Sequence, residues 1–239
     1  MRRLVAIAVV VGAALPAAPA AAATVDVMVV GKERVLRAAG DARLKVRTVK
    51  VGSRRCKVGA ATPLSALAST KLKLGFRDYG RCGKRVRDAG GLYVTKVAGE
   101  REKGRGGWVY KVGRRAGSTA AADMSGPFGT GRRLRGGDRV LWFWCEQDSA
   151  GGCQRTLEAQ PDRAAAAPGD TLTVTVRGYD DFGKGMDVEG ATVTLGSASA
   201  VSGPGGVAVL TVPAATGALR LEAVKDGLVR SFPREVAVG

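Results

Sequence analysis

Apolar and polar residues alternate in short runs along the first half of the chain, which is typical of β-strands separated by turns. The pattern begins at residues 25–30, and a turn at Gly40-Asp41 precedes the next apolar recurrence. One short helix is predicted after Thr62, which can cap it, with Pro63 suited to its first position. Three further strands are predicted at residues 91–97, 108–112 and 139–145. This order of hairpin, helix and strands is that of a β-grasp-like sheet.

The second half alternates more regularly and contains no helical period. Residues 171–176 begin a clean two-residue alternation, and similar segments follow at 191–195, 207–212 and 218–224, before a last strand that ends at Val238. Several short strands with turn residues between them predict a β-sandwich. The predicted fold class is therefore mainly β.

The N-terminus has the pattern of a secretory signal peptide. Arg2 and Arg3 precede an apolar stretch at residues 4–15, and four alanines at residues 20–23 provide small side chains for cleavage. The stretch is shorter than the roughly 20 residues that span a bilayer, although an N-terminal anchor is the alternative interpretation. We expect a signal peptide at residues 1–23, a mature chain starting near Thr24, export to the extracellular space or cell envelope, and no membrane span after cleavage.

Export gives the four cysteines a structural meaning, because disulfides persist in oxidising compartments. Four cysteines allow three pairings, and we favour the two local ones, Cys56–Cys82 and Cys145–Cys153. A zinc site is disfavoured because the chain has no CxxC pair and no histidine.

The charge changes sharply near residue 160. Residues 24–159 carry 29 basic and 12 acidic side chains, whereas residues 160–239 carry seven and nine. Together with the Ala/Pro-rich run after Pro161, this step predicts a basic domain at 24–159, a linker at 160–167 and a sandwich at 168–239. We expect the two domains to fold independently, since few contacts normally cross such a boundary.

The first domain resembles the transcobalamin-like C-terminal domain of unknown function that occurs in exported bacterial proteins. The resemblance rests on the segments 62–67, 107–112 and 134–142, and it covers about residues 24–158. Family members commonly have Asn-Gly after the Tyr-containing strand, where this chain has Gly113-Arg114-Arg115. In cobalamin carriers such domains help to enclose the corrin ring. Those carriers also need a second, α-helical domain, and no segment of this sequence is a candidate for it. Cobalamin binding is therefore kept only as an alternative.

The second domain resembles the bacterial immunoglobulin-like and carboxypeptidase-regulatory-like modules of surface proteins. The segments 189–196 and 205–213 carry this resemblance, which covers most of residues 168–239. It implies a spacer or an adhesive unit.

The missing histidines argue against an enzyme, because they exclude Ser-His-Asp and Cys-His nucleophilic systems. We expect no catalytic residues, no cofactor and no metal. Asp180 and Asp181 could join Asp187 and Glu189 in a calcium site, although acids in a loop are more often solvated.

The basic, aromatic-rich domain is instead expected to bind a ligand. Strand alternation places Trp142 and Trp144 on one face, and Trp108 and Tyr110 also share a face. An exposed aromatic strip rimmed by arginines would suit an anionic cell-wall polymer or glycan, whereas a strand covered on both sides would make these rings core. The candidate contacts are Trp108, Tyr110, Trp142, Trp144, Arg114, Arg115, Arg132 and Arg133.

The predicted function is therefore a secreted, non-enzymatic binding protein with the sandwich as spacer. Specific nucleic-acid binding is not expected, and the sequence does not indicate an oligomeric state. Alternatives are a structural envelope protein whose charge is only a solvated surface, and a small-molecule binder of the cobalamin-carrier type.

Overall fold

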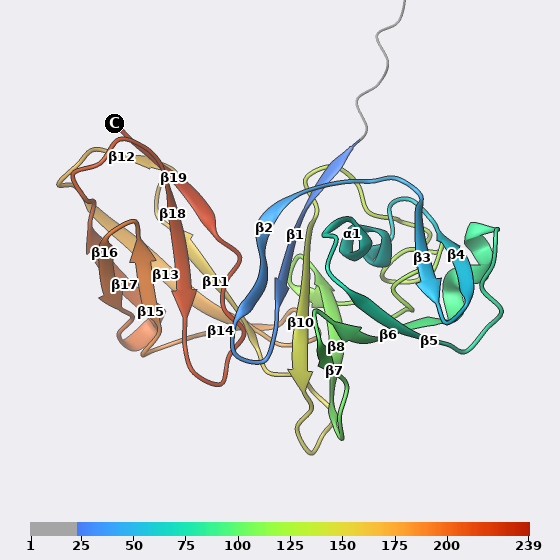
Figure 1. Ribbon diagram of the computed structural model, residues 1–239. Coiled ribbons are helices and arrows are strands. Elements are labelled where there is room, and N and C mark those ends of the chain that lie inside the picture. Colours follow the sequence, from blue (N-terminus) through green and yellow to red (C-terminus); the bar gives the residue numbers. More distant parts are fainter. Residues whose placement is uncertain (1–22) are drawn as a thin grey trace, which may run out of the picture.

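The computed structural model describes residues 23–239, so the predicted signal peptide lies almost entirely outside the described residues. Two β-rich modules lie side by side, and the predicted mainly-β fold class is confirmed (Figure 1). No helix within residues 23–239 is long and apolar enough to cross a membrane.

The first module is built on a five-stranded sheet in the order β2-β1-β10-β8-β9. Strand β10 lies between a parallel partner, β1, and an antiparallel partner, β8, and six consecutive residues of β10 are buried. Such a run identifies a central strand covered on both faces. The strands are β1 (Thr24–Val30), β2 (Val35–Arg43), β8 (Gly106–Val112), β9 (Arg115–Ala116) and β10 (Arg139–Glu146).

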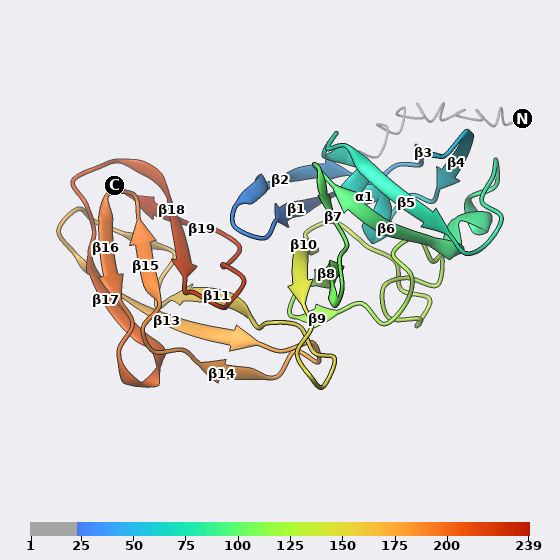
Figure 2. The same ribbon diagram turned by 60° about the horizontal axis from the view of Figure 1, so that its bottom comes forward.

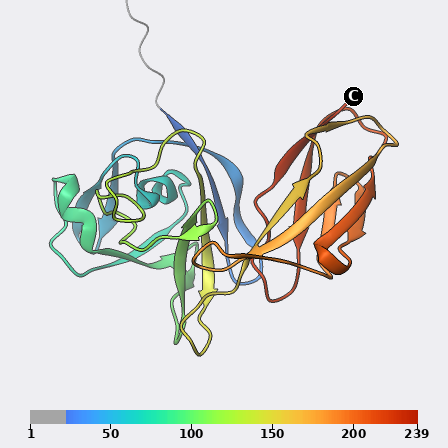
Figure 3. The ribbon, with the colours of Figure 1, turned by 180° about the vertical axis from the view of Figure 1, so that it is seen from behind.

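One face of this sheet is covered by the short helix α1 (Pro63–Ser69), which starts where the sequence predicts. Thr62 and Ser65 form a capping box, in which each side chain accepts a hydrogen bond from the backbone N–H of the other. Leu64 and Leu67 are fully buried and join the core of the module. The long segment between β9 and β10 covers the rear of this module (Figure 3).

A hairpin at the end away from the second module and a small sheet that extends from beside β8 toward that end complete the first module (Figure 1). Strands β3 (Arg47–Val51) and β4 (Arg54–Val58) form the hairpin, and β5 (Leu74–Asp78), β6 (Leu92–Val97) and β7 (Glu100–Arg101) form the sheet. Between β5 and β6 lies a 3-10 turn, η1 (Val86–Gly91). The structure contains both favoured disulfides: Cys56–Cys82 ties β4 to the segment before η1, and Cys145–Cys153 closes the loop after β10. Two disulfides are typical of proteins from oxidising compartments.

The second module is a two-layer sandwich. One layer pairs β13 with β11, β14 and β17, and the other has the order β12-β19-β18-β15-β16. A separate core of leucine, valine and alanine side chains fills the space between the layers. The strands are β11 (Thr156–Pro161), β12 (Ala165–Ala166), β13 (Thr171–Tyr179), β14 (Gly185–Asp187), β15 (Thr192–Leu195), β16 (Ala198–Val201), β17 (Val207–Thr211), β18 (Gly217–Val224) and β19 (Arg234–Val238); a 3-10 turn, η2 (Pro204–Gly206), precedes β17.

The predicted linker at residues 160–167 is wrong. Strand β11 begins at Thr156 and pairs with β13 along its whole length, and β12 pairs with β19, so both strands belong to the sandwich. The second module therefore starts directly after Cys153, and the basic domain does not extend to residue 159. The charge step misplaced the boundary because net charge depends on surface residues, whereas the boundary depends on which residues pack in each core. Leu157 and Ala159 are buried in the sandwich core.

The two modules share an interface that the sequence did not predict. Met28, Leu141 and Phe143 of the β1–β10 sheet form a buried cluster with Val229 of the sandwich, and Phe232 packs against this cluster. The face of the sheet opposite α1 is thus covered by the second module. This contact explains why β10 is buried on both faces.

Lys111 of β8 is the polar centre of that interface. Its side chain is fully buried, and its Nζ donates to the carbonyl oxygens of Tyr179 and Asp180, both at 2.9 Å, and to Thr156 Oγ1 at 3.3 Å. Asp181 Oδ1 lies 3.6 Å from the ammonium. Burial lowers the pKa of Lys111, and the carboxylate of Asp181 opposes that effect. A lysine of the first module is therefore bound by one turn of the second.

Candidate functional site

The four predicted aromatic contacts lie in the core of the first module. Trp142 is 1% exposed, Trp108 and Trp144 are 4% exposed, and Tyr110 is 6% exposed. Trp142 Nε1 donates to the carbonyl of Pro63 at 3.2 Å, which fixes the ring against α1. Of the two interpretations, the strand covered on both sides is confirmed and the exposed aromatic strip is wrong, because α1 and the β9–β10 segment cover this face of the sheet.

Replacing Trp142 with alanine is expected to destabilise the protein by about 3–5 kcal/mol, because it leaves a large cavity between β10 and α1. Urea denaturation followed by circular dichroism measures the change. Tyr79→Ser, at a side chain that is 70% exposed, is the control and should change stability little. A Trp142→Ala protein as stable as the wild type would contradict the core assignment.

The four predicted arginines do not gather at one place either. Arg114 pairs with Glu158 of the sandwich at 2.6 Å, and its guanidinium lies over the ring of Tyr179. Arg115 lies over the ring of Phe128, and Arg132 pairs with Asp138 at 3.1 Å. Arg133 is exposed. Arg114 is an interface residue, and none of the four rims an exposed aromatic surface.

A cleft of about 760 Å³ lies between the two modules. Asp26 and Asp41 line one wall, and burial followed by the carboxylate of Asp41 raises the pKa of Asp26. The acidic and basic side chains of the cleft are equal in number, so it offers no net attraction to a polyanion. They are Asp26, Asp41, Asp162, Glu235, Arg139, Arg163, Arg220 and Arg234.

Positive charge concentrates instead at the far end of the first module, on the β3–β4 hairpin and the segment after β5. In β4, Cys56 and Val58 point into the core, whereas Arg55 and Lys57 are exposed. Lys50 of β3 lies directly opposite Arg55 in the hairpin register and is also exposed. Like charges at opposed positions of a hairpin repel each other, and a bound anion would relieve that repulsion.

The segment after β5 is held against this hairpin by covalent and polar contacts. The Cys56–Cys82 disulfide links the two, and the Lys57 N–H donates to the carbonyl of Gly83 at 2.8 Å. Asp78 accepts from the N–H groups of Gly80 and Cys82, both at 3.0 Å, and pairs with Arg54 at 2.9 Å. Burial of Asp78 raises its pKa, but the two N–H donors and Arg54 outweigh this, so the pKa lies below its usual range. These contacts fix the backbone of the segment from which the basic side chains extend.

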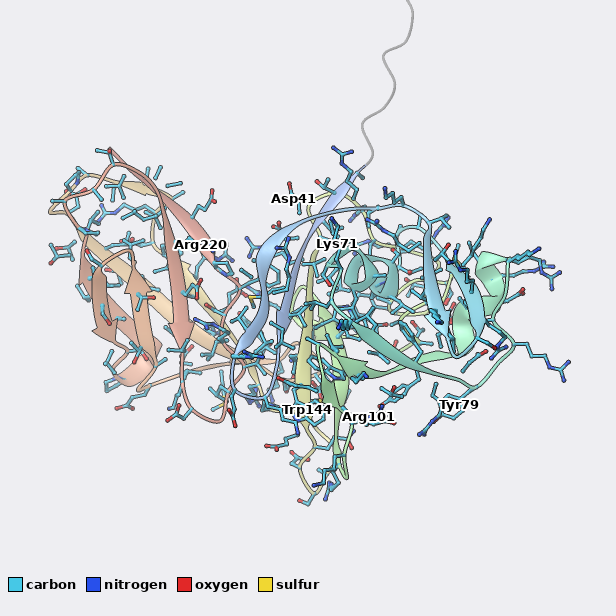
Figure 4. The ribbon with its side chains drawn as sticks, viewed as in Figure 1. Asp41, Lys71, Tyr79, Arg101, Trp144 and Arg220 are labelled. Carbon is cyan, nitrogen blue, oxygen red and sulfur yellow. A yellow bond between two sulfur atoms is a disulfide. The ribbon has the colours of Figure 1, made fainter. Side chains whose placement is uncertain are left out.

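We call residues 50–57 and 78–88 together the basic end. It has eight basic side chains and two acidic ones, and both acids are engaged, Asp78 with Arg54 and Asp88 with Arg85. Long nitrogen-tipped side chains extend into solvent over β4 and η1 (Figure 4). The basic side chains are Lys50, Arg54, Arg55, Lys57, Arg81, Lys84, Arg85 and Arg87.

Two exposed tyrosines lie at the basic end, Tyr79 within its second segment and Tyr93 beside it. Tyr79 is 70% exposed and Tyr93 is 38% exposed, with their ring centroids 6.3 Å apart. Arg77 Nη1 donates to the hydroxyl of Tyr79 at 3.1 Å, and Arg77 also pairs with Glu102. Figure 4 shows Tyr79 at the margin of the module, directed into solvent. This pair forms an exposed aromatic surface, which the buried tryptophans do not.

The basic end could have been found in the sequence. Arg54, Arg55 and Lys57 flank Cys56, and Arg81 and three further basic residues flank Cys82. Two cysteines expected to pair bring their flanking residues together, so the two runs predict one positive surface.

The acids considered for calcium have other roles. Asp180 accepts from the backbone N–H groups of Phe182 and Lys184, which together with nearby positive charge lowers its pKa. Asp181 faces Lys111, and Asp187 pairs with Arg177 at 3.1 Å. Within residues 23–239 no group of three or more His, Cys, Asp or Glu side chains is placed to hold a metal ion.

The transcobalamin-like and immunoglobulin-like resemblances remain predictions that rest on their sequence motifs. Comparison of the chain with family models, curated proteins and solved structures finds no match.

Proposed function

We propose that this protein is an exported, non-enzymatic binding protein of the cell envelope or extracellular space, whose basic end holds an anionic glycopolymer. The observation that carries the proposal is the excess of eight basic over two acidic side chains on a braced surface. Lys50 and Arg55 gain most from an anion, because they oppose each other and neither has an acidic partner among the ion pairs of residues 23–239.

The tyrosine pair supports a glycan rather than a simple polyphosphate. Sugar rings present apolar faces that stack on exposed aromatic side chains, and Tyr79 and Tyr93 lie beside the positive surface. Arg77 and Glu102 add hydrogen-bonding groups next to these rings. Charge would supply most of the affinity, and stacking would supply the preference for sugar.

The sandwich would serve as a rigid arm. It contacts the first module through Lys111 and the Met28–Phe143 cluster, on the side opposite to the basic end (Figures 1 and 3). The polymer-binding surface is therefore directed away from the second module.

Binding of the whole mature chain to immobilised heparin, polyphosphate and uncharged dextran tests the proposal. We expect binding to heparin and polyphosphate, and none to dextran. Tyr79→Ser with Tyr93→Ser should weaken heparin binding several-fold and leave polyphosphate binding unchanged. Equal binding to dextran, or binding to none of the three, would contradict the proposed function.

A further inference from the structure

Strands β6 and β8 lie beside each other without pairing (Figure 2). Strand β6 pairs with β5 on one side, and on the other side with β7 at Lys96 and Val97 only. Strand β8 pairs with β10 on one side, and on the other side with β9 at Lys111 and Val112 only. Residues 92–94 of β6 and 108–110 of β8 therefore each have one edge with no strand partner among the described residues.

Hydrogen bonds close both ends of the space between these edges. At one end the Glu102 N–H donates to the carbonyl of Thr95 at 2.9 Å, and at the other the Gly117 N–H donates to that of Tyr110 at 3.1 Å. We call the space between them the slot. It has a volume of about 400 Å³, and its lining includes the apolar side chains of Leu92, Val94, Trp108, Tyr110, Ala121 and Trp142.

The backbone direction in both strands is fixed by their neighbours. Gly106 exchanges hydrogen bonds with Lys103, and Tyr110 accepts from Gly117, so the backbone groups of both face away from β10. Trp108 lies midway between Gly106 and Tyr110. Because every second residue of a strand directs its backbone N–H and C=O groups to the same side, those of Trp108 also face away from β10. The Tyr79 N–H donates to the carbonyl of Gly91, so the same alternation directs the backbone of Val94 away from β5. Val94 and Trp108 thus present peptide groups to the slot from opposite walls.

A second cavity of about 400 Å³ continues the slot past Tyr93 and Val109, which line both spaces. Its basic side chains are Arg77, Lys103 and Arg105, and Glu102 is its one acid and pairs with Arg77. The exit from the apolar slot is therefore positively charged.

We infer that the slot binds an extended segment of a partner protein, in which apolar residues alternate with acidic ones. Strand addition of this kind uses main-chain hydrogen bonds for affinity and alternating side chains for specificity. Its apolar side chains would face Ala121 and Trp142, and its carboxylates would face Lys103 and Arg105. A ligand without peptide groups would leave the edges of both walls unpaired. The slot shares Tyr79 and Tyr93 with the tyrosine pair proposed to stack on sugars, but its lining contains none of the eight basic side chains of the basic end.

The probe is the capped hexapeptide acetyl-EVEVEV-amide, titrated into the whole mature chain at 150 mM salt. We expect binding, with slowed hydrogen exchange at the amides of Val94 and Trp108. Methylating the valine nitrogens of the peptide removes donors without removing apolar surface, and it should weaken binding at least tenfold. The capped peptide acetyl-VVVEEE-amide, which has the same composition and charge, should bind at least tenfold more weakly.

Ala120→Trp, at an exposed residue of the slot lining, should weaken binding of the hexapeptide at least tenfold. Ala214→Trp, at an exposed loop residue of the sandwich, is the matched control and should leave it unchanged. Equal affinity for the methylated or the non-alternating peptide would overturn the inference, as would unchanged exchange at Val94 and Trp108. Loss of heparin binding on neutralising the basic end would leave both results unchanged, because none of its eight basic side chains lines the slot.

Discussion

Replacing Lys111 with methionine is expected to separate the unfolding of the two modules into two transitions. The wild-type ammonium donates to the carbonyls of Tyr179 and Asp180 and faces Asp181 inside the interface. Methionine has a similar length but no donor, so two carbonyls would lose their donor and Asp181 would keep only the hydrogen bond from the Cys153 N–H. Removing one member of a fully buried charge pair costs on the order of 3–5 kcal/mol, and the loss here should be smaller because Asp181 is partly exposed. Differential scanning calorimetry measures the result.

Lys73→Met is the matched control, because Lys73 is exposed and lies in the same module. It should leave one transition at an unchanged temperature. Wild-type cooperativity in the Lys111→Met protein would mean that the apolar cluster of Met28, Phe143 and Val229 holds the modules together without the lysine.

Neutralising four residues of the basic end is expected to lower the affinity for heparin by one to three orders of magnitude at low salt. The change combines Lys50→Ser, Arg55→Ser, Lys84→Ser and Arg87→Ser, at exposed residues that form none of the ion pairs found within residues 23–239. Each cationic contact with a polyanion releases condensed counterions and raises the affinity by a factor. The reductions in affinity from several lost contacts therefore multiply. Surface affinity measurements at 50 mM salt quantify it.

A second variant neutralises four other exposed residues of the same module, which lie on β2 and between α1 and β5. It has the same net charge as the first variant but an intact basic end, and its affinity should stay within a few-fold of wild type. Equal losses in both variants would mean that the charge acts as a diffuse field. The replaced residues are Arg37, Arg43, Lys71 and Lys73.

Much of the local structure in the first module could be predicted because it depends on local chemistry, but the turn expected at Gly40-Asp41 is wrong, since both residues pair with β1 within β2. Thr62 and Pro63 specify the start of α1, and the predicted strands at 91–97, 108–112 and 139–145 closely match β6, β8 and β10. The mainly-β class follows from the same alternation. These features need only near neighbours in the chain.

The interface and the site could not be predicted in the same way. Alternation assigns Trp142 and Phe143 to opposite faces of β10, but not which face is covered, and here α1 covers one and the sandwich the other. Lys111 looks like an ordinary surface lysine until the turn at Tyr179 is placed over it. The boundary at residue 160 failed for a related reason, since the pairing of β11 with β13 is a long-range contact.

The salt dependence of heparin binding, compared between the two charge-matched variants, tests the central claim most directly. If the basic end makes the contacts, the slope of log affinity against log salt should be shallower than wild type by about one per residue removed there. It should be nearly unchanged in the variant at Arg37, Arg43, Lys71 and Lys73. A wild-type slope for the variant at Lys50, Arg55, Lys84 and Arg87 would show that the polymer binds elsewhere and would contradict the account.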